Sequence, residues 1–81
     1  MKETFIKKYW SEQDITFYIH FQNDEAMRQI EISNKKAILT SSEKPVSSNS
    51  VLYDQNLSSL EINFDDIITR LDFEKIWKKY D

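Results

Sequence analysis

The sequence contains neither cysteine nor glycine, and these two absences remove several classes of protein. Without cysteine, a disulfide scaffold, a thiolate zinc site and a cysteine nucleophile are excluded. An average glycine usage of about 7% would give roughly five or six glycines in a chain of this length. Their absence excludes the glycine-rich loops that cradle phosphates in the common nucleotide-binding enzymes. Tight turns must instead use asparagine, aspartate, serine or lysine.

Histidine and long apolar segments are also scarce. The chain has one histidine, so a histidine-rich metal site is excluded. No apolar run approaches the roughly 20 residues that a membrane-spanning helix needs. Residues 1–10 mix charged and aromatic side chains and lack the apolar core of a signal peptide. We therefore expect a soluble, cytoplasmic protein with no cofactor and no membrane segment.

The charge of the chain is unevenly distributed. The net charge is −3, but residues 1–50 hold seven acidic and seven basic residues and are neutral. Residues 54–74 hold one base, Arg70, and six acids: Asp54, Glu61, Asp65, Asp66, Asp72 and Glu74. The sequence therefore predicts an acidic surface confined to one stretch of the chain.

The 81 residues are 40% hydrophobic and 14% aromatic, which is enough for one small domain covering residues 1–81. Four strands are predicted in the first half, at residues 4–10, 14–22, 26–32 and 37–40. The second is the clearest, because every other residue is apolar: Ile15, Phe17, Ile19 and Phe21. Thr16, Tyr18, His20 and Gln22 then form a polar face that we expect to be exposed. Short turns favour antiparallel pairing, with Asn34 in a positive-φ turn.

The second half changes to loop and helix patterns. Residues 41–50 are rich in serine and predict a mobile loop, and residues 51–53 a short fifth strand. Residues 56–63 fit a short helix or turn, with Phe64 pointing inward. Thr69 and Asp72 form a capping box before a helix at residues 70–80 with one apolar stripe. The predicted fold is α+β: an antiparallel sheet of four to five strands with a C-terminal helix packed on one face.

Catalytic, metal and nucleic-acid sites each have a weak candidate. Tyr18 and His20 share one strand face, and Glu31 on the next strand could join them for acid–base chemistry. No oxyanion site, metal or cofactor accompanies this trio, so we do not expect an enzyme. The paired Asp65 and Asp66 lack the spacing and glycine of an EF-hand, which favours a solvated acidic loop over a metal site. Single-strand binders stack bases on aromatic residues but need a basic groove, and this chain is acidic.

Protein binding is the function that the remaining features favour. An acidic surface attracts a basic partner and raises the association rate. Many basic proteins bind nucleic acid, and an acidic protein can block them by placing carboxylates where phosphates bind. We expect the contacts to be Asp54, Glu61, Asp65 and Asp66. Tyr18 and His20 form a second candidate patch, because tyrosine is enriched in interface hot spots.

Several segments also resemble a family of small bacterial proteins. The segment RQIEI at residues 28–32 fits an R-x-[VI]-E-[IV] strand, and LSSLEIN at residues 57–63 and FEKIW at residues 73–77 are similar as well. Members of this family resemble the immunity proteins of polymorphic-toxin and contact-dependent growth inhibition systems. The resemblance implies a protein that binds and neutralises a cognate toxin, often a nuclease.

We therefore expect an immunity protein that covers the basic active-site surface of a toxin without binding nucleic acid itself. The alternative is a small nucleic-acid or regulatory binding module that uses the aromatic sheet face. The identity of the toxin and the oligomeric state stay open, because an exposed edge strand could pair two copies.

Overall fold

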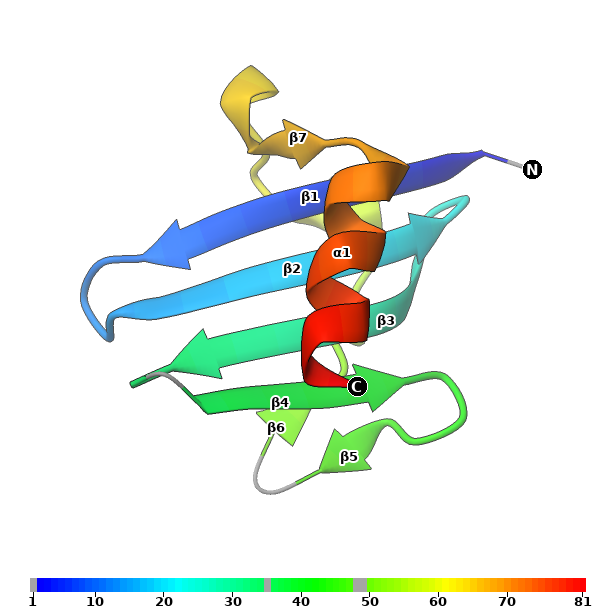
Figure 1. Cartoon of the computed structure of the whole chain (residues 1–81). Coiled ribbons are helices and arrows are strands. Elements are labelled where there is room, and N and C mark those ends of the chain that lie inside the picture. Colours follow the sequence, from blue (N-terminus) through cyan, green and yellow to red (C-terminus); the bar gives the residue numbers. More distant parts are fainter. Residues whose placement is uncertain (1, 35, 48–49) are drawn as a thin grey trace.

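The computed structural model describes residues 2–34, 36–47 and 50–81 (Figure 1). The long strands are β1 (Glu3–Trp10), β2 (Ile15–Gln22), β3 (Glu25–Ser33) and β4 (Lys36–Ser41). Short elements follow: β5 (Val46–Ser47), β6 (Ser50–Val51), the 3₁₀ helices η1 (Leu57–Ser59) and η2 (Phe64–Asp66), and β7 (Ile67–Ile68). Helix α1 (Arg70–Tyr80) comes last.

The main sheet has five antiparallel strands in the order β4-β3-β2-β1-β7. Its first four strands form a meander, and α1 crosses one face of the sheet (Figure 1). The α+β fold with a C-terminal helix on one face is therefore confirmed. Residues with positive φ lie in the three meander turns, at Asp14 (53°), Asn23 (56°) and Asn34 (50°). Asparagine and aspartate tolerate this conformation better than other residues that carry a side chain, which explains how the turns form without glycine.

The fifth strand is not the one that the sequence predicts. Residues 51–53 do not join the main sheet, because β6 pairs with β5 in a separate two-stranded hairpin. The edge position is taken by β7, whose Ile67 and Ile68 pair with Ile6 and Phe5 of β1. A strand of two residues is too short to show an alternating pattern, so periodicity could not reveal it.

The hairpin of β5 and β6 also lies partly in the segment that the sequence predicts as a loop. Residues 46–47 and 50–51 are paired, whereas residues 48–49 lie outside the described residues. The mobility of residues 41–50 stays a prediction.

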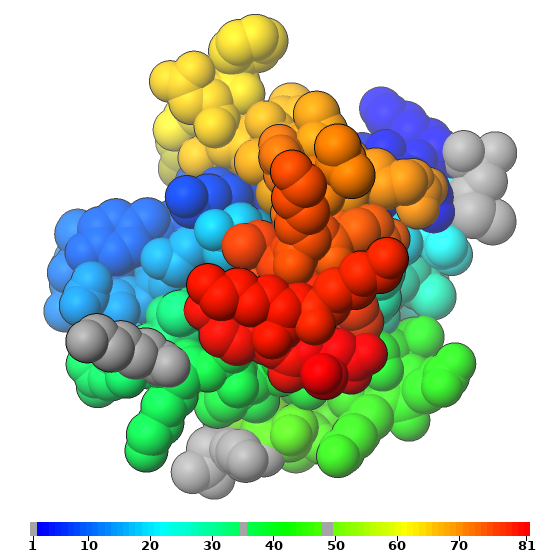
Figure 2. All heavy atoms as spheres, viewed as in Figure 1, coloured from blue at the N-terminus to red at the C-terminus, as the bar shows by residue number. Residues whose placement is uncertain are grey.

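Both faces of the sheet are covered. On the helix face, Phe5, Ile30 and Phe73 form a buried cluster against the apolar stripe of α1. On the opposite face, Ile6, Ile19, Phe21 and Ala26 are buried beneath the irregular segment of residues 52–62. This segment contributes the partly buried side chains Leu52, Tyr53, Leu57, Leu60 and Ile62. The space-filling view shows α1, in red, across the helix face, and the segment before it at the β1 edge (Figure 2).

The N-terminus of α1 is capped as the sequence predicts. The Asp72 N–H donates to Thr69 Oγ1 over 3.1 Å, and the Thr69 N–H donates to the Asp72 carboxylate over 3.4 Å. These bonds satisfy backbone donors that have no partner within the helix. Ile68, just before the cap, packs against the cluster that contains Phe73. The helix therefore begins at a fixed place beside β7.

Candidate functional site

Tyr18 and His20 lie beneath helix α1, so the prediction that their strand face is exposed is wrong. His20 is only 4% exposed, and Tyr18 packs against the helix-face cluster. The alternation of β2 is real, but each face of the sheet has a cover, so His20 is buried and Thr16, Tyr18 and Gln22 are partly buried. Glu31 does not join Tyr18 and His20, because it lies on the opposite face, where its carboxylate accepts a bond from Ser50. The catalytic trio that the sequence suggests is therefore not assembled.

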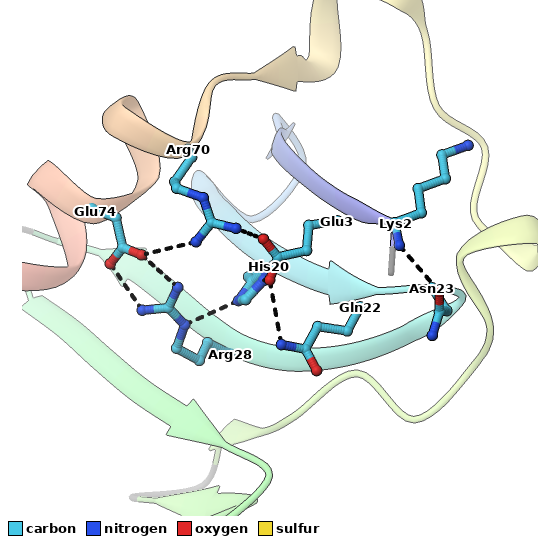
Figure 3. A network of polar contacts seen from close by, with 8 residues as sticks. All are labelled: Lys2, Glu3, His20, Gln22, Asn23, Arg28, Arg70 and Glu74. Atoms are coloured by element: carbon cyan, nitrogen blue, oxygen red, sulfur yellow. Dashed lines mark hydrogen bonds and ion pairs between the residues drawn. The ribbon is translucent and has the colours of Figure 1, made fainter.

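His20 belongs to a network of charged side chains between the sheet and α1 (Figure 3). Arg28 Nε donates to His20 Nδ1 over 3.0 Å. Since the guanidinium can only donate, Nδ1 must be the acceptor, and the ring proton sits on Nε2. Nε2 then donates to Glu3 Oε1 over 3.2 Å. Both nitrogens of a neutral His20 are thus occupied by protein groups, and neither is available to a substrate.

The same network fastens α1 to the sheet. Arg28 makes two bonds to the Glu74 carboxylate, of 2.9 and 2.8 Å, in the fork geometry that suits a guanidinium. Arg70 pairs with Glu3, and its Cζ lies 5.0 Å from the ring centroid of Phe5. Strands β1 and β3 are thereby joined to the helix through ion pairs at the border of the core.

Burial lowers the pKa of His20, and the nearby Arg28 guanidinium lowers it further, against an opposing effect of Glu74. Hydrogen bonds from Arg28 lower the pKa of Glu74. Both shifts keep the network in the arrangement just described, with a neutral imidazole and an ionised carboxylate.

The predicted acidic residues divide into one with a structural role and three that are exposed. Asp66 accepts a bond from the Asn63 N–H over 2.9 Å and one from the Lys8 ammonium over 3.1 Å. These bonds lower the pKa of Asp66. Its carboxylate caps η2 and fastens this segment to β1, so it is less free for a partner than the sequence suggests. Asp54, Glu61 and Asp65 are exposed.

Exposed apolar side chains accompany these acids, and sequence reasoning missed them. Phe64 is 90% exposed and does not point inward as the sequence predicts. Ile67 and Leu71 are also more than half exposed, and the segment that carries all three runs along the β1 edge from η2 through β7 into α1 (Figure 1). We call the following exposed acidic and apolar side chains the 61–72 surface: Glu61, Phe64, Asp65, Ile67, Leu71 and Asp72. Arg70 is exposed in the same stretch and pairs with Glu3 and Glu74. The signal in the sequence is the FDDII segment, where apolar residues flank adjacent acids.

A hollow of about 420 Å³ lies on the sheet face opposite α1. The aromatic side chains that line it are Trp10, Phe17 and Tyr53, and its carboxylates are Glu31 and Asp54. Trp10, which lines the hollow, is 53% exposed, and its ring meets that of Phe17 edge-on with centroids 5.4 Å apart. We call this feature the Trp10 hollow. It brings the predicted contact Asp54 together with the aromatic residues Trp10, Phe17 and Tyr53.

The part of the chain that the structure describes contains no group of three or more histidine, cysteine or acidic side chains placed to hold a metal ion. Within that same part, no helix is long and apolar enough to cross a membrane. Comparison with protein-family models, curated proteins and solved structures finds no match to this chain. Function must therefore be argued from the 61–72 surface and the Trp10 hollow themselves.

Proposed function

We propose that the protein is a cytoplasmic immunity protein that binds a cognate bacterial toxin and neutralises it. The toxin is a nuclease with a basic active-site surface, and the immunity protein covers that surface. The observation that carries the proposal is the 61–72 surface, where exposed carboxylates and exposed apolar side chains occur together along one stretch of the chain.

This combination has the composition of a binding surface for a basic protein. Buried apolar side chains at the centre of an interface supply most of its affinity, and a charged rim raises the association rate and selects the partner. Phe64 and Ile67 supply the apolar centre, and Glu61 and Asp65 supply the negative rim. A basic nuclease surface complements both the charge and the apolar area.

The nucleic-acid alternative is not favoured by a specific observation. The aromatic sheet face on which it depends lies beneath α1, where His20 and Phe5 stack on each other with ring centroids 4.5 Å apart. The 61–72 surface also carries three carboxylates, which repel phosphates.

The experiment is co-expression with the product of the neighbouring open reading frame, followed by purification of the complex and a toxicity assay. We expect a stoichiometric complex with a basic protein whose toxicity is suppressed. The double variant Glu61→Lys, Asp65→Lys should lower the association rate by about tenfold at low salt and less at high salt. Glu43→Lys is the matched control, because Glu43 is exposed outside this surface. Recovery of no partner, or of nucleic acid alone, contradicts the proposal.

Phe64→Ala separates the apolar centre from the charged rim. Because the side chain is 90% exposed, its loss should leave folding intact. In the complex it should raise the dissociation rate and leave the association rate nearly unchanged. An unchanged dissociation rate would exclude Phe64 from the interface.

A further inference from the structure

Arg28 shows how this chain holds an arginine. The guanidinium carbon lies 4.8 Å from the ring centroid of Phe73 and 5.2 Å from that of Trp77, while Glu74 accepts two of its hydrogen bonds. Arg70, the other arginine of the sequence, lies against the Phe5 ring and pairs with the carboxylates of Glu3 and Glu74. Both arginines lie on the helix face of the sheet.

The Trp10 hollow, on the opposite face, is also lined by aromatic and acidic residues, and no arginine lines it. Its aromatic components are Trp10, Phe17 and Tyr53, and its carboxylates are Glu31 and Asp54. Aromatic faces attract cations, and tryptophan does so most strongly. Since the chain has no third arginine, an arginine in this hollow would have to come from another molecule.

The charge balance of the hollow also favours a cation. Lys8 lines it and would repel a cation if its ammonium were free. That ammonium donates instead to the Asp66 carboxylate over 3.1 Å and to the Glu61 carbonyl over 2.7 Å. With Lys8 neutralised by Asp66, Glu31 and Asp54 leave the hollow with a net negative charge.

We propose that the Trp10 hollow binds an arginine side chain that a basic protein partner inserts. Arginine suits it better than lysine, because the planar guanidinium stacks on aromatic rings, is more weakly hydrated and can bond to a carboxylate at its edge. The inference rests on the proposed function for the source of the arginine. The 61–72 surface and the hollow adjoin each other, since Lys8 lines the hollow and bonds to the backbone of Glu61. One partner can therefore cover both.

The first test uses a small probe in place of the partner. N-acetyl-arginine methylamide is titrated into the ¹⁵N-labelled protein, and N-acetyl-citrulline methylamide serves as a neutral probe of the same shape. We expect saturable shifts at the indole N–H of Trp10 and the amides of Phe17 and Tyr53, with binding of citrulline weaker by about tenfold. The indole of Trp77, on the helix face, is the internal reference and should not shift.

Two outcomes of this titration overturn the inference. Equal binding of both probes, or tighter binding of a neutral aromatic probe such as indole, would identify an apolar ligand site without selection for a cation. Absence of saturable shifts well into the millimolar range, where contacts of this size are expected to bind, would exclude an arginine site.

Matched variants assign the binding to named side chains. Trp10→Ala should abolish the saturable shifts, whereas Tyr9→Ala, which removes an equally exposed neighbour on the other side of β1, should keep them. Asp54→Asn should weaken binding several-fold, with Glu43→Gln as the control at an exposed acid outside the hollow. Trp10 and Asp54 are both exposed, so their substitution is not expected to unfold the protein and obscure the result.

Measurement on the purified complex separates this inference from the proposed function. If the partner binds Trp10→Ala as tightly as the unaltered protein, the inference is overturned and the proposed function stands. If no partner is found but the arginine probe binds at Trp10, the proposed function is overturned and the arginine site stands. Loss of partner affinity by at least about tenfold in Trp10→Ala, but not in Tyr9→Ala, supports both.

Discussion

The two faces of the sheet carry aromatic rings beside carboxylates, but they differ in what holds their covers. On the helix face, an α-helix lies over the sheet, and Arg28 and Arg70 bridge it to strands through carboxylates. On the opposite face, an irregular segment lies over the sheet, and Gln29 holds it through its amide. The helix is held by ion pairs, whereas the irregular segment is held by bonds from Gln29 and from the Lys8 ammonium, and the Trp10 hollow lies beside it.

The two faces therefore have different roles: the helix face stabilises the fold, and the opposite face offers groups to a partner. On the helix face, Arg28 and Arg70 are paired with Glu74 and Glu3, and the rings of Phe5 and Phe73 are buried. The opposite face has rings and carboxylates that remain accessible, as the exposure of Trp10 shows. Exposed apolar groups beside unpaired charges are what a partner can use. We infer that α1 beyond its first turn is a structural element and that the partner-binding groups lie at the β1 edge, in the first turn of α1 and on the face opposite the helix.

The largest expected effect comes from the helix-face core. Phe73 is 0% exposed, and Phe73→Ala should lower the free energy of unfolding by about 3–5 kcal/mol. That is a large part of the roughly 4–12 kcal/mol expected for a domain of this size. Phe64→Ala is the matched control and should change it by less than about 0.5 kcal/mol, because Phe64 buries almost nothing. Urea denaturation measures the free energy of unfolding of both variants. Similar losses would contradict the burial of Phe73 and the exposure of Phe64.

The positions of Phe73 and Phe64 also show how much of this structure could be predicted from the sequence. The helix and its core side were predictable, because the capping box and the apolar stripe are local patterns. Phe64 was misplaced because η2 has three residues and no periodicity. The two-residue β7 was missed for the same reason.

The burial of His20 needed information from distant parts of the chain. Its partners Glu3 and Arg28 lie on the neighbouring strands β1 and β3, and Glu74, bonded to Arg28, lies on α1. A polar strand face normally indicates solvent, and only the packing of α1 shows that these polar groups satisfy one another. The Trp10 hollow was likewise hidden, since it joins β1, β2 and β3 to residues 51–54.

The second prediction tests the ion pairs that fasten the helix. Arg28→Met keeps an unbranched stem against Phe73 and Trp77 but leaves the Glu74 carboxylate and His20 Nδ1 without their donor. We expect a loss of about 1.5–3 kcal/mol in the free energy of unfolding. Arg70→Met should cost about 1 kcal/mol or less, because Arg70 is more exposed. Equal costs would show that the bidentate bond is not what fastens α1.

The third prediction concerns the cover of the opposite face. Gln29 is buried, its Nε2 donates to the Val51 carbonyl over 3.1 Å, and its Oε1 accepts from the Tyr53 N–H over 3.0 Å. Gln29→Ala should lower the free energy of unfolding by about 1–2 kcal/mol. Hydrogen exchange should accelerate at the Tyr53 amide and much less in α1. Uniform acceleration in both regions would mean that the two covers open together.

The smallest effect is a pH dependence that belongs to the helix face alone. Because the pKa of His20 is lower in the folded than in the unfolded chain, where it is about 6.5, the unfolded chain takes up the proton first as the pH falls. Stability should therefore decrease as the pH falls below about 6.5. Protonation at Nδ1 also places an N–H of His20 opposite the Nε–H of Arg28. Neither donor then has its acceptor, and the hydrogen bond beside the Arg28–Glu74 pair is lost. The lowered pKa values of Glu74 and Asp66 add a further loss only in the usual carboxyl range, near about pH 4.

His20→Gln is the variant that assigns this dependence. Urea denaturation between about pH 7.5 and about pH 5.5 should show a falling free energy of unfolding in the unaltered protein and a flatter profile in the variant. The two tryptophans report on the two faces: the Trp77 indole resonance should move with the titration, because Trp77 lies on Arg28, and that of Trp10 should not. His20 is not the group that makes the helix face sensitive to acid in either of two cases. The first is that the free energy of unfolding of His20→Gln depends on pH as steeply as that of the unaltered protein. The second is that the Trp10 indole resonance moves with pH as that of Trp77 does.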